Sequence, residues 1–486
     1  MIFKCNNRFA SDFIPTVYDI VGFSFFTCYR SLLVNYDFLL TCFFRTFAVD
    51  FKVKKAIHTV FCFLFVLPLT AQTIYRLPVN ELFERGLQNS VVIQASMVNT
   101  QIADEKTGIA KNRRLPDVAA GGSFGYVGTP VVLNPNLSFL ERSEVPRWGQ
   151  NYQIVAIQPL YEGGRIKNEI KRSELEKEMA QLSLEKDKSN LKLWLIAKYL
   201  DLFNLYKQRD VYAQTIEEAK KRVHDIEKMK EQGIVTTNDV LRSKLLLTNY
   251  NLAYTEIDNN ITLASQQLDI VLGMDETTIL QPDSSFLTPM PDLKLENDYV
   301  TQAYAQYPDL KIAQTTISLA QNALQTVKAD YLPTLSLQAS AALTRPIPYI
   351  VPVQDRFVNT WGITLNLSYS LSALFNMKHN SNVAKQHIRL QELAQEQQQQ
   401  TVRIEIKAAW LKHQEAGERI KALEESLAQS NENYRIEKNK YFNQLTILTD
   451  LLDATTTQLN AELQLTAAKT NAIYTYYQLL KASGNL

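Results

Sequence analysis

The chain has 486 residues, enough for several domains or for one elongated domain. Its net charge is +1 at pH 7, which argues against a general nucleic-acid-binding protein, because such proteins present a basic surface. Charged residues make up 21%, and glycine and proline are few, so disorder throughout the chain is excluded.

The first 71 residues contain a secretory signal that does not start at the N-terminus. Lys54 to Ala71 joins two lysines, a ten-residue apolar core and a Leu-Thr-Ala end, so we predict a signal peptide at 53–71. Residues 1–52 then form an extension, either from a start site placed too early or as a membrane-embedded segment. Gln72 is not a lipid-anchoring cysteine. Every cysteine precedes it, which predicts a mature chain without disulfides or thiol metal sites: Cys5, Cys28, Cys42 and Cys62.

The remaining sequence repeats one unit twice, at 72–290 and 291–486. In the first unit we expect a helix from Val79 to Arg113, and in the second a helix from Leu295 to Ala329. Each helix is followed by Leu-Pro, and proline ends a helix and favours extended geometry in the residue before it. The sequence therefore predicts an internal structural duplication.

A pair of strands follows each Leu-Pro. We expect them at 117–128 and 149–160, and at 333–344 and 361–372. In the last pair apolar residues alternate with small polar ones over lengths that suit a tilted transmembrane strand. Trp148 and Trp361 both open the second strand of their pair, where aromatic residues mark a membrane interface.

Four strands are too few for a soluble sandwich, the alternative interpretation, and too few to close a barrel alone. We therefore expect them to pair with strands of other copies.

Long helices complete each unit. We predict them at 165–232 and 234–272, and at 376–440 and 447–483. The first lacks glycine and proline and spans about 100 Å at the helical rise. Its apolar residues recur at spacings of three and four, which is coiled-coil patterning: Ile216, Ala219, Val223 and Ile226.

The second helices of the two units align without gaps at an offset of 211 residues. Asp239 aligns with Asp450, and Arg242 takes the place of Asp453. The duplication thus turns a pair of aspartates into an aspartate and an arginine.

Together these features resemble the TolC-like outer-membrane efflux proteins. The resemblance rests on QPLYEGGR (158–165), GIVTTNDVLRSK (233–244) and LTILTDLLDATTTQLNAE (445–462). It implies an α+β membrane protein in the outer membrane: a homotrimer with a twelve-stranded β-barrel, continued by an α-helical coiled-coil tunnel through the periplasm. It also implies a periplasmic adaptor and an inner-membrane pump of the RND or ABC class as partners.

The chemistry that the sequence predicts is that of a passive channel, not of an enzyme. No metalloprotease, phosphate-binding, hydrolase or dinucleotide motif is present, and we expect no cofactor. The histidines of the mature chain are expected on the solvated helix surface: His224, His379, His387 and His413.

The resemblance places a gate at the turns between the long helices. Asp450 and Asp453 correspond to the family's gate aspartates, and three copies would form rings of carboxylates that attract cations. The simpler alternative is that they are ordinary carboxylates at a helix N-terminus. Tyr441 matches a tyrosine that helps to hold the gate shut. The chain departs from the family at Gln444, in place of a glycine, and at Thr446, in place of an arginine.

We therefore hypothesise that Arg242 or Lys244 pairs with Asp450 or Asp453 of a neighbouring hairpin. The competing interpretation of the whole chain is a periplasmic coiled-coil adaptor or structural interaction protein, which would lack the two strand pairs.

Overall fold

The structure is a computed structural model that describes residues 74–142, 144–283, 293–347, 349–350 and 352–486. The predicted signal peptide and the extension before it lie outside the described residues. Gln72–Leu486 forms one compact unit, and the elements below belong to it.

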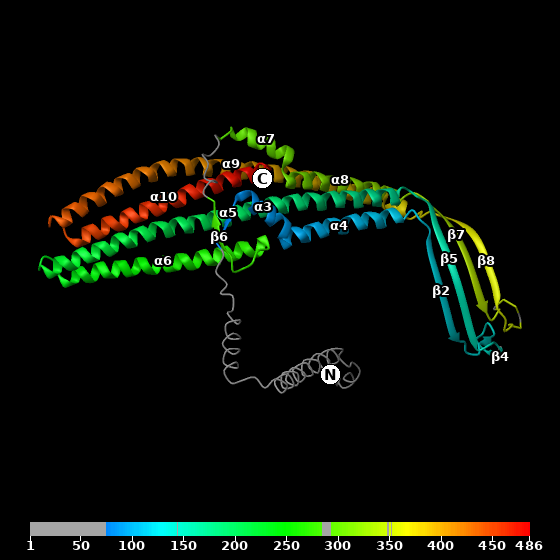
Figure 1. Cartoon of the computed structure of the whole chain (residues 1–486). Helices are drawn as coiled ribbons and strands as arrows, with labels where there is room; N and C mark the ends of the chain where they lie inside the picture. The colour runs from blue at the N-terminus through cyan, green and yellow to red at the C-terminus, as the bar shows by residue number, and fades with distance from the viewer. Residues whose placement is uncertain (1–73, 143, 284–292, 348, 351) are drawn as a thin grey trace, which may run out of the picture. The chain divides into compact units, whose positions relative to one another are not determined.

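Each half of this unit has its own series of helices and strands (Figure 1). The first half contains β1 (Ile74–Leu77), α3 (Val79–Asn89), α4 (Val91–Asn112), β2 (Asp117–Tyr126), β3 (Val131–Leu133), β4 (Phe139–Arg142), β5 (Trp148–Glu162), α5 (Arg165–Glu231), α6 (Thr237–Leu272) and β6 (Ile279–Pro282). The second contains α7 (Glu296–Gln306), α8 (Pro308–Ala329), β7 (Thr334–Arg345), β8 (Val358–Ser368), α9 (Ala373–Phe442) and α10 (Leu448–Ala482).

The first helix of each half is interrupted, whereas the sequence predicted it to be continuous. The breaks fall at Ser90 and Tyr307, whose backbones are extended, with ψ of 122° in both. Tyr307 precedes Pro308, and a residue before proline is disfavoured in helical geometry. This proline is also the first residue of α8, where its missing N–H costs no hydrogen bond. The predictions of single helices at 79–113 and 295–329 were wrong in this respect.

Four strands form one antiparallel sheet in the order β2-β5-β7-β8. The register gives the sheet two unlike faces. Ala120, Ile154, Ala341 and Trp361 lie in one row across the apolar face, whereas Asp117, Ile157, Gln338 and Thr364 lie in one row across the other. That second face is mostly small and polar and carries a hydrogen bond between strands, from Thr344 Oγ1 to Asn151 Oδ1 at 3.0 Å.

The strand predictions differ from the structure mainly at the ends. β8 runs from Val358 to Ser368, so the predicted strand 361–372 starts too late and extends too far. Its last residues form turns instead, with the amide of Ala373 donating to the carbonyl of Ser370 as α9 begins. Two short pairs were not predicted: β1 beside β6 in parallel, and β3 beside β4 in antiparallel.

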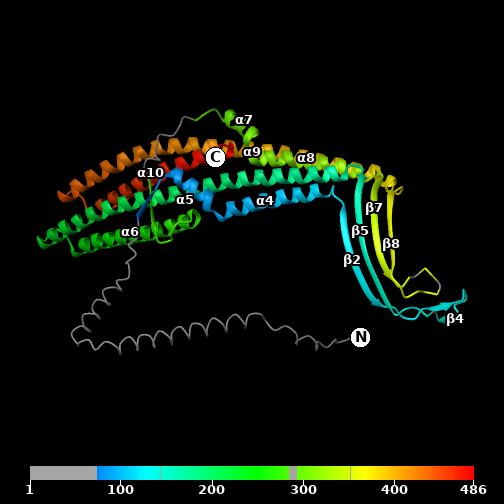
Figure 2. The ribbon, with the colours of Figure 1, turned by 45° about the vertical axis from the view of Figure 1, so that its right-hand side comes forward.

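The helices lie side by side in the same order as the strands that they continue. α4 packs against α5, α5 against α8, and α8 against α9 (Figures 1 and 2). Farther from the sheet α6 packs against α5, α5 against α10, and α10 against α9. The predicted coiled-coil residues Ile216, Ala219, Val223 and Ile226 are all buried. The helices in the described part of the chain are too short or too polar to cross a membrane.

Candidate functional site at the hairpin tips

Two helical hairpins, α5/α6 and α9/α10, turn at equivalent positions. Gly233 and Gln444 both adopt left-handed backbone geometry, with φ of 74° and 61°. The hydrogen bonds match as well, because the amides of Gly233 and Gln444 donate to the carbonyls of Lys230 and Tyr441. The turn therefore has the same geometry in both halves, although glycine is present in only one.

The two aligned aspartates begin the returning helices in different ways. Asp239 forms a capping box with Thr236, whose amide donates to Asp239 Oδ2 at 2.9 Å. α10 has no such cap, since Ile447 occupies the N-cap position. Asp450 instead accepts a hydrogen bond from Thr446 Oγ1 at 2.6 Å. Asp239 thus serves its own helix, while Asp450 and Asp453 are both exposed.

The cations of the proposed latch have other partners within the chain. Arg242 donates from Nη1 to Thr449 Oγ1 at 3.0 Å, which joins α6 to α10 one residue before Asp450. Lys244 pairs with Glu227 of its own hairpin at 2.7 Å. Among the described residues, no ion pair includes Asp450 or Asp453. A single chain therefore brings Arg242 beside α10 without pairing it to either aspartate.

Tyr441 lies inside the tip and not on its surface. It is 4% exposed and packs with Ile226, Val240, Leu448 and Leu451, which come from both hairpins. Its hydroxyl has no hydrogen-bond partner among the described residues. Burial, with the charge of Asp239 as a second cause, raises the pKa of Tyr441 above its ordinary value. The structure therefore makes Tyr441 part of the packing between the hairpins.

One residue of this region was not singled out from the sequence. Arg222 of α5 is buried and donates from Nη1 to Thr455 Oγ1 of α10 at 2.5 Å. Thr455 is the first of the three consecutive threonines, and it is buried, whereas Thr456 and Thr457 are exposed. Arg222 lies one residue before the buried Val223, so the helical pattern was compatible with a buried position. Its charge, however, indicated a position in solvent.

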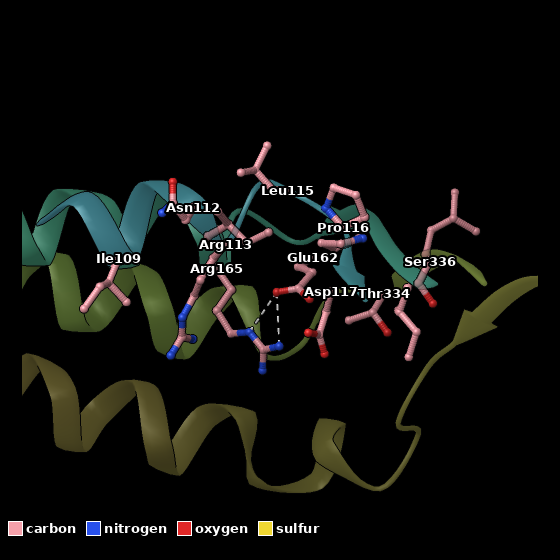
Figure 3. Close-up of a pocket in the computed structure, with 14 residues that line it drawn as sticks. Ile109, Asn112, Arg113, Leu115, Pro116, Asp117, Glu162, Arg165, Thr334 and Ser336 are labelled. Carbon is pink, nitrogen blue, oxygen red and sulfur yellow. Dashed lines mark hydrogen bonds and ion pairs between the residues drawn. The ribbon is translucent and has the colours of Figure 1, made fainter. Parts of the chain in front are cut away.

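At the other end of α5, the sheet meets the helices around a hollow of about 590 Å³. Figure 3 shows Arg165 at this junction, paired with Glu162. Gly163 allows the chain to turn here, since a Cβ atom on it would lie 2.5 Å from the carbonyl oxygen of Ala329. The QPLYEGGR motif thus fixes the connection between β5 and α5.

The two predicted interface tryptophans occupy unlike places in the sheet. Trp148 opens β5 and stacks on Phe124, with ring centroids 5.0 Å apart. Trp361 is exposed but does not open its strand, because β8 begins at Val358. Trp361 pairs with Ala341, and Ala341 pairs with Ile154 of β5. Trp361 is therefore level with Ile154, six residues along β5 from Trp148.

The histidines include one that the sequence misplaced. His413 is 5% exposed, and its Nδ1 lies 3.0 Å from Thr475 Oγ1. Burial lowers the pKa of His413 and favours the neutral ring. The expectation of a solvated His413 was wrong, whereas His224, His379 and His387 are exposed. The described residues contain no group of three or more His, Cys, Asp or Glu placed to hold a metal ion.

Comparison with known proteins identifies the family. The sequence pattern of the family described as outer membrane efflux protein matches residues 82–274 and 299–485, which is most of the chain. The chain belongs to this family. No curated protein matches it.

Solved structures share the fold at low sequence identity. A membrane protein from Pseudomonas aeruginosa superposes with a TM-score of 0.69 at 17% identity, over 84% of this chain and 90% of that one. The CmeC outer membrane channel of Campylobacter jejuni gives 0.65 at 17% identity, over 84% and 85%. The outer membrane protein VceC of Vibrio cholerae gives 0.64 at 17% identity, over 84% and 96%.

The predicted family, the fold class of a barrel-forming sheet continued by long helical hairpins, and the outer-membrane location are confirmed. The chain is therefore an outer-membrane efflux protein. The alternative of a periplasmic adaptor is not supported, because the chain carries the four-stranded sheet that such a protein would lack.

Proposed function

We propose that three copies of this chain form one exit duct for a tripartite export system. The duct receives its cargo from a periplasmic adaptor and an inner-membrane pump of the RND or ABC class, and its energy comes from that pump. We assign no catalytic step to it, because a conduit needs only a lined passage and a gate.

The observation that carries this proposal is the four-stranded sheet with two unlike faces and two free edges. β2 and β8 are its outer strands, and each presents a row of backbone groups with no strand beside it in the described part of the chain. The unpaired N–H and C=O groups of such edges can pair with strands of another chain, and closure into a barrel leaves no edge unpaired. Three sheets of four strands give a closed barrel with the apolar face toward lipid and the polar face toward water.

The long helices continue the passage away from the membrane. α5 runs for 67 residues from the sheet junction to the hairpin turn, about 100 Å at the helical rise. A passage lined by these helices therefore ends at the tips, where α5/α6 and α9/α10 turn. We place the gate there, with Asp450 and Asp453 of the three copies as its carboxylate rings.

Two features support the gate at this place. Asp450 and Asp453 are exposed and lie outside every ion pair of the described chain, so their charge is available to a passing cation. Arg242 is held beside α10 by Thr449 through Nη1, is exposed, and has further N–H donors that can bond to a neighbouring copy. We propose that Arg242 supplies the closing contact between copies and that the adaptor displaces it.

The experiment replaces Arg242, Asp450 and Asp453 one at a time by alanine and measures single-channel conductance in planar bilayers. We expect Asp450→Ala and Asp453→Ala to weaken block by multivalent cations, because each removes one carboxylate ring. Arg242→Ala should raise the frequency of openings. Lys244→Ala is the control, since Lys244 already pairs with Glu227. Three variants indistinguishable from the wild type would refute the gate.

A further inference from the structure

Arg222 is a buried cation that lies between the two hairpins. It is 6% exposed, and it lies nine residues before the end of α5, about 14 Å from the turn. Its Nη1 donates to Thr455 Oγ1, and its Nη2 has no hydrogen-bond partner among the described residues. A guanidinium carries five N–H donors and stays charged, so burial with so few bonds is unfavourable.

The carboxylate nearest to Arg222 along α5 has another hydrogen-bond partner. The carboxylate one turn earlier, Glu218, accepts a hydrogen bond from the Tyr434 hydroxyl at 3.3 Å, and no ion pair among the described residues includes Arg222. Tyr250 of α6 and Tyr434 of α9 also lie near it. Burial raises the pKa of both, and the charge of Arg222 opposes that rise. Residues of all four helices thus enclose the cation.

A neighbouring copy cannot supply the missing bond, because Nη2 is already buried within one chain. The Tyr441 hydroxyl, closer to the tips, is buried without a partner in the same way. Separation of the hairpins would expose both groups to water, which would complete their hydrogen bonds. The packed arrangement therefore carries a penalty that the separated arrangement lacks.

We propose that Arg222 is a positioning residue of the gate that holds α10 through Thr455 and at the same time keeps the closed tip easy to open. This inference rests on the proposed gate at the hairpin tips. It gives a role to the first of the three threonines, since Thr455 follows Asp453 by two residues on the same helix. It also separates Arg222 from Arg242, which is exposed and therefore carries no burial penalty.

Two substitutions should act in opposite directions. Arg222→Met removes the charge and keeps an apolar side chain, and replacing a buried ion by an apolar group commonly stabilises a packed interface. We expect about tenfold fewer openings in planar bilayers. Thr455→Val keeps the shape of the side chain and removes the acceptor, so we expect about tenfold more openings. Arg419→Met, at an exposed arginine of α9, is the matched control and should change nothing.

Amide hydrogen exchange across Leu448–Leu459 gives a readout independent of conductance. Exchange should be slower in Arg222→Met and faster in Thr455→Val, because it reports local separation of α10. Circular dichroism confirms that each variant is folded. Faster exchange or more openings in Arg222→Met would overturn the proposal, because Arg222 would then only stabilise the packing of α10. No change in either measurement would overturn it as well. If exchange changes as expected but the protein shows no conductance in any variant, the role of Arg222 in the packing of α10 is supported and the proposed channel function is refuted.

Discussion

At the scale of single residues, the hairpin turns show what the duplication kept and what it changed. Gly233 and Gln444 share left-handed geometry and the same hydrogen bonds, but only glycine adopts that geometry without strain. The strain at a residue with a side chain is about 1 kcal/mol. The second turn therefore stores strain that the first does not.

Exchanging the two residues tests this. Gln444→Gly should raise the free energy of unfolding by up to about 1 kcal/mol, and Gly233→Gln should lower it by about as much. Urea denaturation followed by circular dichroism measures both. Gly417→Gln is the contrasting substitution, because Gly417 lies inside α9 with open space around it and no left-handed backbone, so glutamine there should not destabilise the protein. Equal destabilisation by all three substitutions would contradict the assignment of strain.

Asp269 predicts a pH dependence of stability. It is fully buried near the end of α6, and neither carboxylate oxygen has a hydrogen-bond partner among the described residues. Burial, with the charges of Asp275 and Glu276 as further causes, raises the pKa of Asp269 to about 7. Between about pH 4 and pH 7 the folded protein keeps a proton that the unfolded chain loses, so stability falls as pH rises through that window.

Asp269→Asn removes this loss. The variant should gain thermal stability over the wild type at pH 8 and little at pH 4, because asparagine is neutral at both. Each kcal/mol should appear as a few degrees, roughly 2–4 °C. Thermal melts at the two pH values measure it, and a gain independent of pH would contradict the raised pKa.

Burial of charged and polar residues was the hardest property to predict from the sequence. Asp450 and Asp453 are exposed in the first turns of α10, as expected of residues after a turn, but Arg222, Tyr441 and His413 are buried. On a long helix with two packed faces, a charged residue next to an apolar one gives no indication of the side to which it points. For Arg222 that information comes from the second hairpin, which packs on α5 from the other half of the chain, whereas His413 is covered by α10 of its own hairpin.

At the scale of elements, periodicity and proline predicted the positions of helices and strands better than the sequence predicted the burial of single residues. Leu-Pro located the start of β2 and β7, and alternation located the faces of β7 and β8. The breaks at Ser90 and Tyr307 were missed, although Pro308 was a visible signal for one of them. The end of β8 was missed because alternation continues through Tyr369 and Leu371, while the backbone is already turning into α9.

The two faces of β8 predict an asymmetric effect of charge. Leu365 belongs to the apolar face and is 61% exposed in the single chain, whereas its neighbour Thr364 belongs to the polar face. Leu365→Lys should destabilise the membrane-inserted form by about 2–4 kcal/mol, and Thr364→Lys should be tolerated. The measurement is the fraction of folded, heat-modifiable protein in lipid vesicles. Equal effects of the two substitutions would contradict the assigned lipid face.

At the scale of the whole molecule, strand order and helix order agree. β2, β5, β7 and β8 succeed one another in the sheet, and α4, α5, α8 and α9 succeed one another beside it. Each chain is therefore one open segment of wall, bounded by β2 and α4 on one side and by β8 and α9 on the other. Several copies of such a segment are needed to close a barrel. The sequence already predicts this, because alternation and Leu-Pro indicate only four long strands.

The most direct test of the account is the native mass of the protein extracted from outer membranes with detergent. Three identical chains in one assembly, absent from the soluble periplasmic fraction, is the predicted result, because three sheets of four strands close the barrel and remove the free edges of β2 and β8. A single chain, a dimer, or protein recovered without detergent would contradict it.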